Sequence, residues 1–247
     1  MLPTEIASHR GGAFLWPENS LLAFRNALAL PAEQLELDVH LSADGEVVVI
    51  HDATLDRTTD AAGPVAARGL AELRGVRLKG TGGEAVPTLA EAAALVAAAG
   101  RVLRLEIKAD AAGRPYPGIL RRCAEVLDGH GLRGRTVLMS FQPATVAGAA
   151  ALGGFLRRVL LMEARAWRGM GAALAAGLCR ACGGEELGLP IAEWDEASVA
   201  ALRGEGLGVS AWGTDHAESI RRAFALGMDA IATDDPALAL SLRGAGG

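Results

Sequence analysis

The chain has 247 residues, 51% of them hydrophobic, and a formal net charge of −5. This length suits one large α/β domain or two small ones, and the acidic balance without a basic run argues against a nucleic-acid partner. No apolar run is long enough to cross a bilayer, and residues 1–5 lack the pattern of a secretion signal. Because an odd number of cysteines also fits a reducing compartment, we expect a cytoplasmic protein with no membrane span.

Strand-like apolar runs alternate with helical patterns along the chain, which is typical of repeated βα-units and a parallel sheet. The predicted strands are 5–8, 35–39, 102–107, 136–139, 159–162, 187–191, 207–211 and 230–232, with a further extended run at 47–50. Helices are predicted from residue 21, between 88 and 99, at 118–127, beyond 143 and near 172, 198, 219 and 236. Asn19 or Ser20 is expected to cap the first helix, and Thr88 the next.

Eight strands with seven or eight helices in this length favour a closed (β/α)₈ TIM barrel. A doubly wound open sheet is the alternative, but no G-x-G-x-x-G pattern follows the first strand. Between residues 52 and 86 the alternation breaks into short polar and Gly-rich pieces. We therefore predict one barrel domain over 1–247 with a small insertion after the second strand, which we call the 52–86 segment.

Two acidic side chains lie two positions apart on the second predicted strand. Alternation places Glu36 and Asp38 on the same face, while Leu35, Leu37 and Val39 face the other way. Such a carboxylate pair is unfavourable unless a proton or a cation compensates it, and hard oxygen ligands suit Mg²⁺ or Ca²⁺. The sequence therefore predicts a divalent metal site on this strand.

Further polar and aromatic residues stand where the predicted strands end, which is where a (β/α)₈ barrel carries its active site. They are His9, Glu36, Asp38, His51, Glu106, Lys108, Ser140, Phe141, Trp212, Thr233 and Asp234. Glu106 and Lys108 repeat the spacing of the first acidic pair, so both should face the barrel interior. Phe141 and Trp212 either form a wall for the substrate or simply pack in the core.

These residues belong to motifs that follow one another along the chain. The motifs are His9-Arg10-Gly11, Pro17-Glu18-Asn19-Ser20, Glu36-Leu37-Asp38-Val39, Asp44-Gly45, His51-Asp52, Leu55-Asp56-Arg57-Thr58-Thr59, Gly63-Pro64-Val65, Pro87-Thr88-Leu89, Leu105-Glu106-Ile107-Lys108, Ser140-Phe141 and Thr233-Asp234-Asp235-Pro236. In this ordered set the chain resembles the glycerophosphodiester phosphodiesterase family. No single motif decides the matter, but the set in this order is very specific.

The resemblance implies a (β/α)₈ barrel with an insertion after the second strand. It also implies an enzyme that hydrolyses glycerophosphodiesters, as small-molecule substrates, to sn-glycerol 3-phosphate and an alcohol. A divalent cation, Mg²⁺ or Ca²⁺, would be held by Glu36, Asp38 and Glu106. Nothing in the sequence decides between the two ions or indicates the oligomeric state.

The same resemblance implies roles for four further residues. His9 and His51 would be the acid and the base, and Arg10 and Lys108 would contact phosphate. Imidazole suits both proton-transfer roles because it titrates near neutral pH. Which histidine is the acid stays open at this point, as does the nucleophile, which is either water or the glycerol 2-hydroxyl.

The chain departs from the family pattern at three places. Ser20 stands where Thr is usual, which is a mild change because both hydroxyls cap helices. Arg104 stands where Asn is common, and its parity places it on the Glu106 side one layer deeper, so we interpret it as a structural counter-ion. Residues 212–215, Trp-Gly-Thr-Asp, replace Trp-Thr-x-Asn and leave open how the glycerol end is held.

Several motif residues have a structural interpretation. Glu18 and Asn19 are expected to fix and cap the loop before the first helix. Asp52, Asp56 and Arg57 are expected mainly to attach the 52–86 segment to the barrel.

Two other functions stay open from the sequence. One is a related phosphodiesterase that acts on lysophospholipids or another phosphodiester. The other is a barrel that only binds a phosphorylated ligand, although binding alone would not need an acid–base pair. The remaining histidines, His40, His130 and His216, are expected to have no direct catalytic role.

Overall fold

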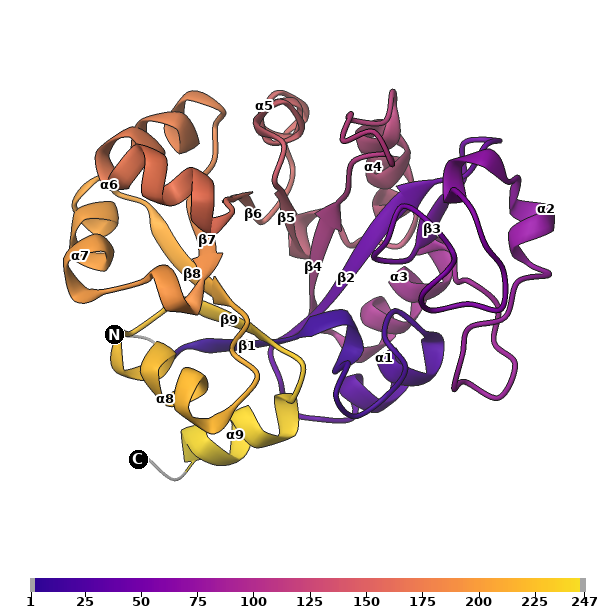
Figure 1. The fold of residues 1–247 in the computed structure, drawn as a ribbon, viewed down its shortest axis with the longest axis horizontal. Helices are drawn as coiled ribbons and strands as arrows, with labels where there is room; N and C mark the ends of the chain where they lie inside the picture. Colours follow the sequence, from indigo (N-terminus) through magenta and orange to yellow (C-terminus); the bar gives the residue numbers. More distant parts are fainter. Residues whose placement is uncertain (1–2, 245–247) are drawn as a thin grey trace.

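A single closed sheet forms the centre of the molecule in the computed structural model, which describes residues 3–244 (Figure 1). The strand order is β1-β9-β8-β7-β6-β5-β4-β2-β3, and β1 also pairs with β2, which closes the barrel. The strands are β1 (Glu5–Ser8), β2 (Gln34–Leu41), β3 (Val47–Val49), β4 (Val102–Ile107), β5 (Thr136–Ser140), β6 (Arg157–Leu161), β7 (Glu186–Pro190), β8 (Gly208–Trp212) and β9 (Ala230–Thr233). All pairs are parallel except β3 against β2. The predicted (β/α)₈ TIM barrel is confirmed, and the extended run near residue 48 is an added antiparallel strand.

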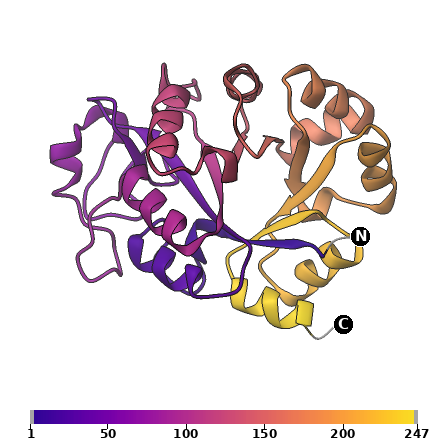
Figure 2. The same ribbon diagram turned by 180° about the vertical axis from the view of Figure 1, so that it is seen from behind.

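The helices lie on the outside of the barrel, as Figure 1 and the reverse view in Figure 2 show. They are α1 (Leu21–Leu28), α3 (Leu89–Ala99), α4 (Ile119–Gly129), α5 (Pro143–Leu152), α6 (Ala164–Ala181), α7 (Glu196–Gly204), α8 (Ala217–Ala225) and α9 (Pro236–Gly244). Ser20, and not Asn19, caps α1, because its hydroxyl accepts a 3.0 Å bond from the Ala23 amide. Thr88 caps α3 as predicted, and Glu91 accepts a 2.9 Å bond from the Thr88 amide in return.

Strand β2 sorts its side chains between two environments. Leu35, Leu37 and Val39 are buried in the apolar layer that α1 and α3 cover. Glu36 and Asp38 are fully buried on the opposite face, toward the inside of the barrel. The predicted alternation is confirmed, and it places two charged side chains where apolar ones are usual.

A charged cluster fills the deep end of the barrel. Arg104 on β4 forms an ion pair with Glu186 on β7 and donates a 2.9 Å hydrogen bond to the Ser210 hydroxyl. Arg157 completes the cluster with a 2.9 Å bond to the other Glu186 oxygen. Arg104 therefore serves as the counter-ion of a buried carboxylate, one layer below Glu106.

The 52–86 segment contains η2 (Val65–Ala67) and the short helix α2 (Leu70–Leu73), and its apolar side chains form a separate cluster with two residues that precede the segment. That cluster comprises Val48, Ile50, Leu55, Val65, Leu73, Val76, Leu78 and Val86. The sequence predicts only irregular pieces here because these apolar residues follow neither the helical nor the strand period. In Figure 1 the segment lies at the edge of the barrel beside β3.

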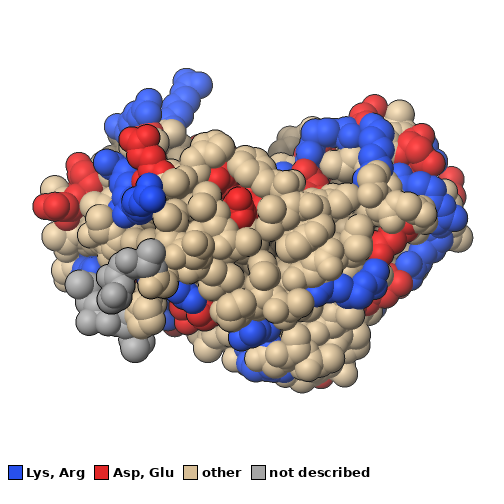
Figure 3. Space-filling view, turned by 90° about the horizontal axis from the view of Figure 1, so that it is seen from below, with Lys and Arg blue, Asp and Glu red and all other residues tan. Residues whose placement is uncertain are grey.

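Opposite charges lie next to one another on the surface. On the face shown in Figure 3, Lys and Arg side chains alternate with Asp and Glu at the two ends of the molecule, and a broad uncharged area lies between them. The exposed ion pairs of the molecule include Arg180 with Glu205 and Arg122 with Glu46. Within residues 3–244, no helix has the length and apolar character needed to cross a membrane.

Candidate active site

The first strand leads into a sharp turn that carries two of the predicted site residues, His9 and Arg10. Arg10 has a φ of 50° and Gly11 a φ of 82°, both in the left-handed region. A Cβ on Gly11 would lie 2.8 Å from the Ala23 Cβ, so glycine is needed for the turn to pass this close to α1. The turn directs the Arg10 backbone N–H at Glu36 Oε2, at 2.7 Å.

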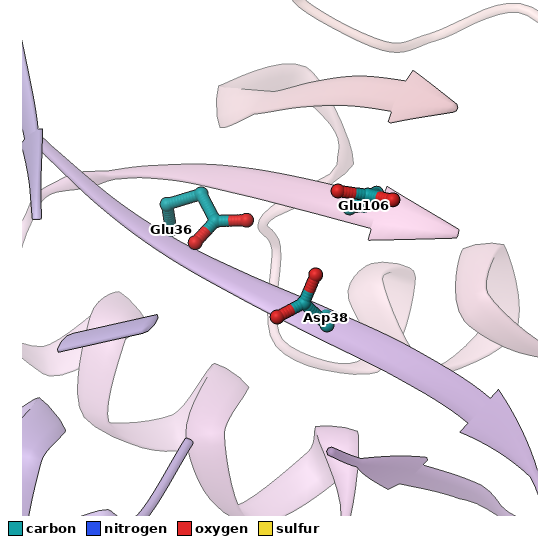
Figure 4. Close-up of side chains that lie close together, drawn as sticks. All are labelled: Glu36, Asp38 and Glu106. Atoms are coloured by element: carbon teal, nitrogen blue, oxygen red, sulfur yellow. The ribbon is translucent and has the colours of Figure 1, made fainter. Parts of the chain in front are cut away.

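Three carboxylates converge inside the barrel mouth. Glu36 and Asp38 come from β2 and Glu106 from β4, and one oxygen of each lies within 4.8 Å of the others. Figure 4 shows the three side chains directed into one space between the two strands. Strand register explains the convergence, because Asp38 and Glu106 are direct neighbours in the β2–β4 pairing.

Burial makes this cluster electrostatically unfavourable on its own. Burial and the neighbouring Asp38 raise the pKa of Glu36 to about 8. Burial also raises the pKa of Glu106 to about 7, although Lys108 opposes the shift. For Asp38, burial alone would raise the pKa, but Lys108, His51 and Arg10 outweigh it and lower the pKa. Full ionisation of all three carboxylates is therefore opposed unless a further cation compensates their charge.

The oxygens of the cluster fit a divalent cation. Glu36 Oε1 and Asp38 Oδ1 are buried and have no hydrogen-bond partner, which is costly unless a ligand binds there. The donor set consists only of carboxylate oxygens, the type preferred by Mg²⁺ and Ca²⁺. The three predicted metal-binding residues therefore form a site that can hold a metal ion.

Two cations flank the carboxylates. Lys108 Nζ lies 2.8 Å from Glu106 Oε1 and 3.5 Å from Asp38 Oδ1. Arg10 Nε lies 3.5 Å from Asp38 Oδ2 and has no hydrogen-bond partner although it is buried. Both side chains line the cavity above the cluster, so each has a donor available for an anionic group in that cavity.

Each predicted catalytic histidine is held by a carboxylate. His9 Nδ1 lies 2.7 Å from Asp234 Oδ1, and His51 Nδ1 lies 2.7 Å from Asp52 Oδ1. A carboxylate at Nδ1 fixes the ring so that Nε2 remains for the cavity. Burial alone would lower the pKa of His9, but Glu36 and Asp234 raise it to about 9.

His51 differs from His9 in the direction of its pKa shift. Burial lowers the pKa of His51, and Lys108 and Arg10 act in the same direction. Its backbone carbonyl accepts a 3.0 Å bond from His40 Nε2, and His40 Nδ1 in turn lies 2.8 Å from the Tyr116 hydroxyl. His40 therefore fixes the His51 backbone, a contact that no motif in the sequence predicts.

Phe141 and Trp212 close the cavity on its apolar side. Their ring centroids lie 6.2 Å apart at an interplanar angle of 80°, and Leu161 and Met139 complete the wall. The cavity has a volume of about 270 Å³. Of the residues predicted to act in catalysis, metal binding or substrate binding, all line it except Asp38, which is fully buried. Trp212 Nε1 is buried and has no hydrogen-bond partner, so this indole N–H can donate to a ligand.

The sequence names Asn19, Asp52 and Asp234 but does not predict which site residue each of them contacts. Asn19 donates a 2.9 Å bond to Asp38 Oδ2 and so orients a carboxylate of the cluster. Asp234 and Asp52 hold the histidines, as described above. Asp52 is adjacent to His51 and Asp234 stands at a strand end, and these positions were the available signals.

Residues 212–215 depart from the family pattern, yet their contacts are well defined. The Thr214 hydroxyl donates a 2.7 Å bond to the Ala232 carbonyl. Asp215 Oδ1 accepts a 2.8 Å bond from the backbone N–H of Asp234. Asp215 therefore supports the residue that holds His9, so the departure acts on the histidine side of the cavity.

A carboxylate cluster, two imidazoles held by carboxylates and two cationic side chains meet at one mouth of the barrel, an arrangement suited to the hydrolysis of phosphoric esters. The model of the glycerophosphoryl diester phosphodiesterase family matches residues 9–238. The chain belongs to this family of enzymes, which hydrolyse glycerophosphodiesters.

Relatives of known sequence and structure agree with this assignment. A glycerophosphodiester phosphodiesterase from Caldanaerobacter subterraneus subsp. tengcongensis is 30% identical and is matched over 100% of both chains. The crystal structure of a putative glycerophosphoryl diester phosphodiesterase from Agrobacterium tumefaciens is 30% identical, has a TM-score of 0.96, and the match covers 99% of this chain and 98% of that one. A phosphodiesterase from Oleispira antarctica, solved with the product sn-glycerol-3-phosphate, is 27% identical with a TM-score of 0.86, over 98% and 97% of the two chains.

Proposed function

We propose that this enzyme hydrolyses small glycerophosphodiesters to sn-glycerol 3-phosphate and an alcohol, with a divalent cation and the His9–His51 pair. The observation that carries the proposal is a set of buried atoms at one mouth of the barrel that lack hydrogen-bond partners: Glu36 Oε1, Asp38 Oδ1, Arg10 Nε and Trp212 Nε1. Such groups are costly in a folded protein unless a ligand satisfies them. The carboxylate oxygens are acceptors that a metal could satisfy, and the Arg10 and Trp212 N–H groups are donors that a phosphodiester could satisfy.

Glu36, Asp38 and Glu106 would hold the cation, either Mg²⁺ or Ca²⁺. When bound, the metal would supply positive charge that polarises a phosphoryl oxygen. Arg10 and Lys108 would bind the other phosphoryl oxygens and orient the diester. Because attack at phosphorus increases the negative charge on these oxygens, fixed donors stabilise the transition state more than the ground state.

His9 and His51 would move the protons. Each presents Nε2 to the cavity, because a carboxylate occupies Nδ1 at 2.7 Å. One imidazole would accept the proton of the nucleophile, and the other would protonate the oxygen of the leaving alcohol. The nucleophile is either water, which gives sn-glycerol 3-phosphate directly, or the glycerol 2-hydroxyl, which gives a cyclic phosphate that water then opens. Both routes use the same pair of residues.

Phe141 and Trp212 would enclose the glycerol arm. The cavity that they close, at about 270 Å³, is slightly smaller than the range of about 300–1,000 Å³ for ligand pockets. This size favours a short polar diester over a lysophospholipid, whose glycerol arm carries a long acyl chain.

We also propose that residues 1–247 act as a single barrel domain with the 52–86 segment as its insertion. A cytoplasmic location is part of the proposal, supported by three free, buried cysteines, Cys123, Cys179 and Cys182. The partners would be small molecules and not nucleic acid, because the net charge is −5.

Turnover on a small panel tests the proposal. Glycerophosphocholine, glycerophosphoethanolamine and a lysophospholipid would each be incubated with the protein plus Mg²⁺ or Ca²⁺, and again with a chelator. We expect release of sn-glycerol 3-phosphate from the first two substrates, and loss of that activity with the chelator. Turnover of the lysophospholipid alone would replace the proposed substrate class, and binding without turnover would replace the proposed reaction.

A further inference from the structure

Arg57, in the 52–86 segment, joins two carboxylates that come from different parts of the chain. Its Nε and Nη2 donate to Asp52 at 2.7 and 3.0 Å. Its Nη1 and Nη2 donate to Glu18 at 2.6 and 2.8 Å. The guanidinium thus forms two forked contacts at once, a geometry that only arginine provides.

Each of these carboxylates also holds a group of the active site. Asp52 Oδ1 lies 2.7 Å from His51 Nδ1, and Glu18 Oε1 accepts a 3.1 Å bond from Arg10 Nη1. One continuous chain of charged hydrogen bonds therefore runs from His51 through Asp52, Arg57 and Glu18 to Arg10. The bonds from Arg57 hold the pKa of Asp52 well below its ordinary value, so this carboxylate stays charged toward His51.

The backbone of Arg57 is itself fixed within the 52–86 segment. Lys79 Nζ donates 3.0 Å bonds to the carbonyl oxygens of Asp56 and Arg57. Leu55, two residues earlier, is fully buried in the apolar cluster of the segment. The backbone position from which the guanidinium extends is therefore set by the fold of this segment.

Stability alone gives little reason for this arrangement. The Arg57 side chain is 47% exposed, and ion pairs that face water contribute little to folding because solvent screens them. Orientation is a different matter, since a displacement of about 1 Å in a catalytic group can cost about 10²-fold in rate. His51 and Arg10 both face the reacting phosphate in the proposed function.

We propose that Arg57 is a positioning residue that holds His51 and Arg10 together, so that the 52–86 segment takes part in assembling the active site. The inference rests on the proposed function. Arg57 touches neither the cavity nor the metal-binding cluster, so it acts through Asp52 and Glu18 alone.

A matched pair of variants tests the inference. Arg122 is the control, because its side chain is 48% exposed and contacts two carboxylates, Glu46 and Glu125, each at 3.2 Å, away from the site. We expect Arg57→Ala to lower kcat on glycerophosphocholine about 10- to 100-fold, while Arg122→Ala keeps the wild-type value. Both variants should unfold at similar temperatures, since both lose exposed ion pairs.

Two further variants separate positioning from a general structural role. Arg57→Lys should recover only part of kcat, because an ammonium group cannot make both forks. Adding Arg57→Ala to Asp52→Asn should cost less than Arg57→Ala costs alone, because both changes break the same chain. Full additivity, or equal kcat for Arg57→Ala and Arg122→Ala, would overturn the inference. If Arg57→Ala does not fold, kcat is compared among Arg57→Lys, Asp52→Asn and the double variant that combines them. A double variant no slower than Asp52→Asn supports the inference, and full additivity of the two changes overturns it.

A substrate-free measurement keeps this inference separate from the proposed function. The ¹H–¹⁵N signals of the His51 imidazole should shift in Arg57→Ala and stay unchanged in Arg122→Ala. If the wild-type protein turns over no diester while these signals shift as expected, the proposed function fails and the positioning role stands. If the diester is hydrolysed and the signals do not move, the positioning role fails alone.

Discussion

The two ends of the barrel interior both bury charge, but they do so differently. At the deep end, the Glu186 carboxylate is paired with Arg104 and Arg157 and hydrogen-bonded by the Ser210 hydroxyl. At the mouth, Glu36 and Asp38 each leave an oxygen without a partner. Buried charges that satisfy one another serve the fold, whereas buried charges left incomplete are available to a ligand. The contrast identifies the mouth as the functional end without reference to any relative.

The largest effect is expected from the histidines at the mouth. His9→Ala and His51→Ala each remove one proton-transfer group, which is typically worth about 10²–10⁴-fold in rate. We expect kcat to fall by that factor while far-UV circular dichroism stays the same. His130→Ala is the control, because His130 lies at the end of α4, outside the site. Near-normal rates in both site variants would remove the acid–base assignment.

The same substitution at the two ends should have opposite consequences. Glu106→Gln at the mouth relieves repulsion within the carboxylate cluster, so we expect activity to be lost and stability to be kept or raised. Glu186→Gln leaves Arg104 as an unpaired buried charge, which costs about 3–5 kcal/mol of unfolding free energy. Urea denaturation and turnover, measured on both variants, check the comparison. Equal destabilisation by both would contradict it.

The stability that the Glu186 carboxylate contributes should depend on pH. Burial alone would raise the pKa of Glu186, but Arg104, Ser210 and Arg157 outweigh it and lower the pKa below the ordinary 4.5. A carboxylate with a lowered folded-state pKa stabilises the fold above its unfolded-state pKa, and this contribution is lost as the pH falls. The stability gap between the wild type and Glu186→Gln should therefore be full at neutral pH and narrow below about pH 4.5. A gap that widens in acid would refute this.

Added metal should also distinguish the carboxylates at the mouth from Glu186 at the deep end. A ligand that binds only the folded state stabilises it by about 2.7 kcal/mol at a hundred times its dissociation constant. We expect Mg²⁺ or Ca²⁺ to raise the melting temperature of the wild type and of Glu186→Gln, but not that of Glu106→Gln. A rise in Glu106→Gln equal to that of the wild type would place the ion elsewhere.

How far the sequence predicts this molecule depends on the range of the interactions involved. Strand parity places Glu36 and Asp38 inside the barrel, because alternation is a local property of the chain. Asp234 holds His9 across almost the whole length of the chain, and Asn19 orients Asp38 from a loop. Such contacts depend on where the closed barrel brings distant residues, which no local pattern encodes.

The structure of the 52–86 segment is also not predicted by local sequence patterns. Its apolar residues form a cluster that follows neither the helical nor the strand period, so the sequence predicts irregular pieces. The sequence predicts that Arg57 mainly attaches this segment to the barrel. Its contacts with Asp52 and Glu18 do attach the segment, and they also reach two site residues.

The smallest effect is expected at the aromatic wall. Trp212→Phe removes an indole N–H that has no partner within the protein but keeps most of the ring. Since a hydrogen bond is worth about 0.5–1.5 kcal/mol, we expect KM for glycerophosphocholine to rise about 2- to 10-fold with little change in kcat or stability. Phe141→Leu is the matched variant, because it thins the same wall without removing a donor. If both variants raise KM equally, the ring and not the N–H holds the substrate, and the indole N–H would no longer count among the unpaired groups that distinguish the mouth from the deep end.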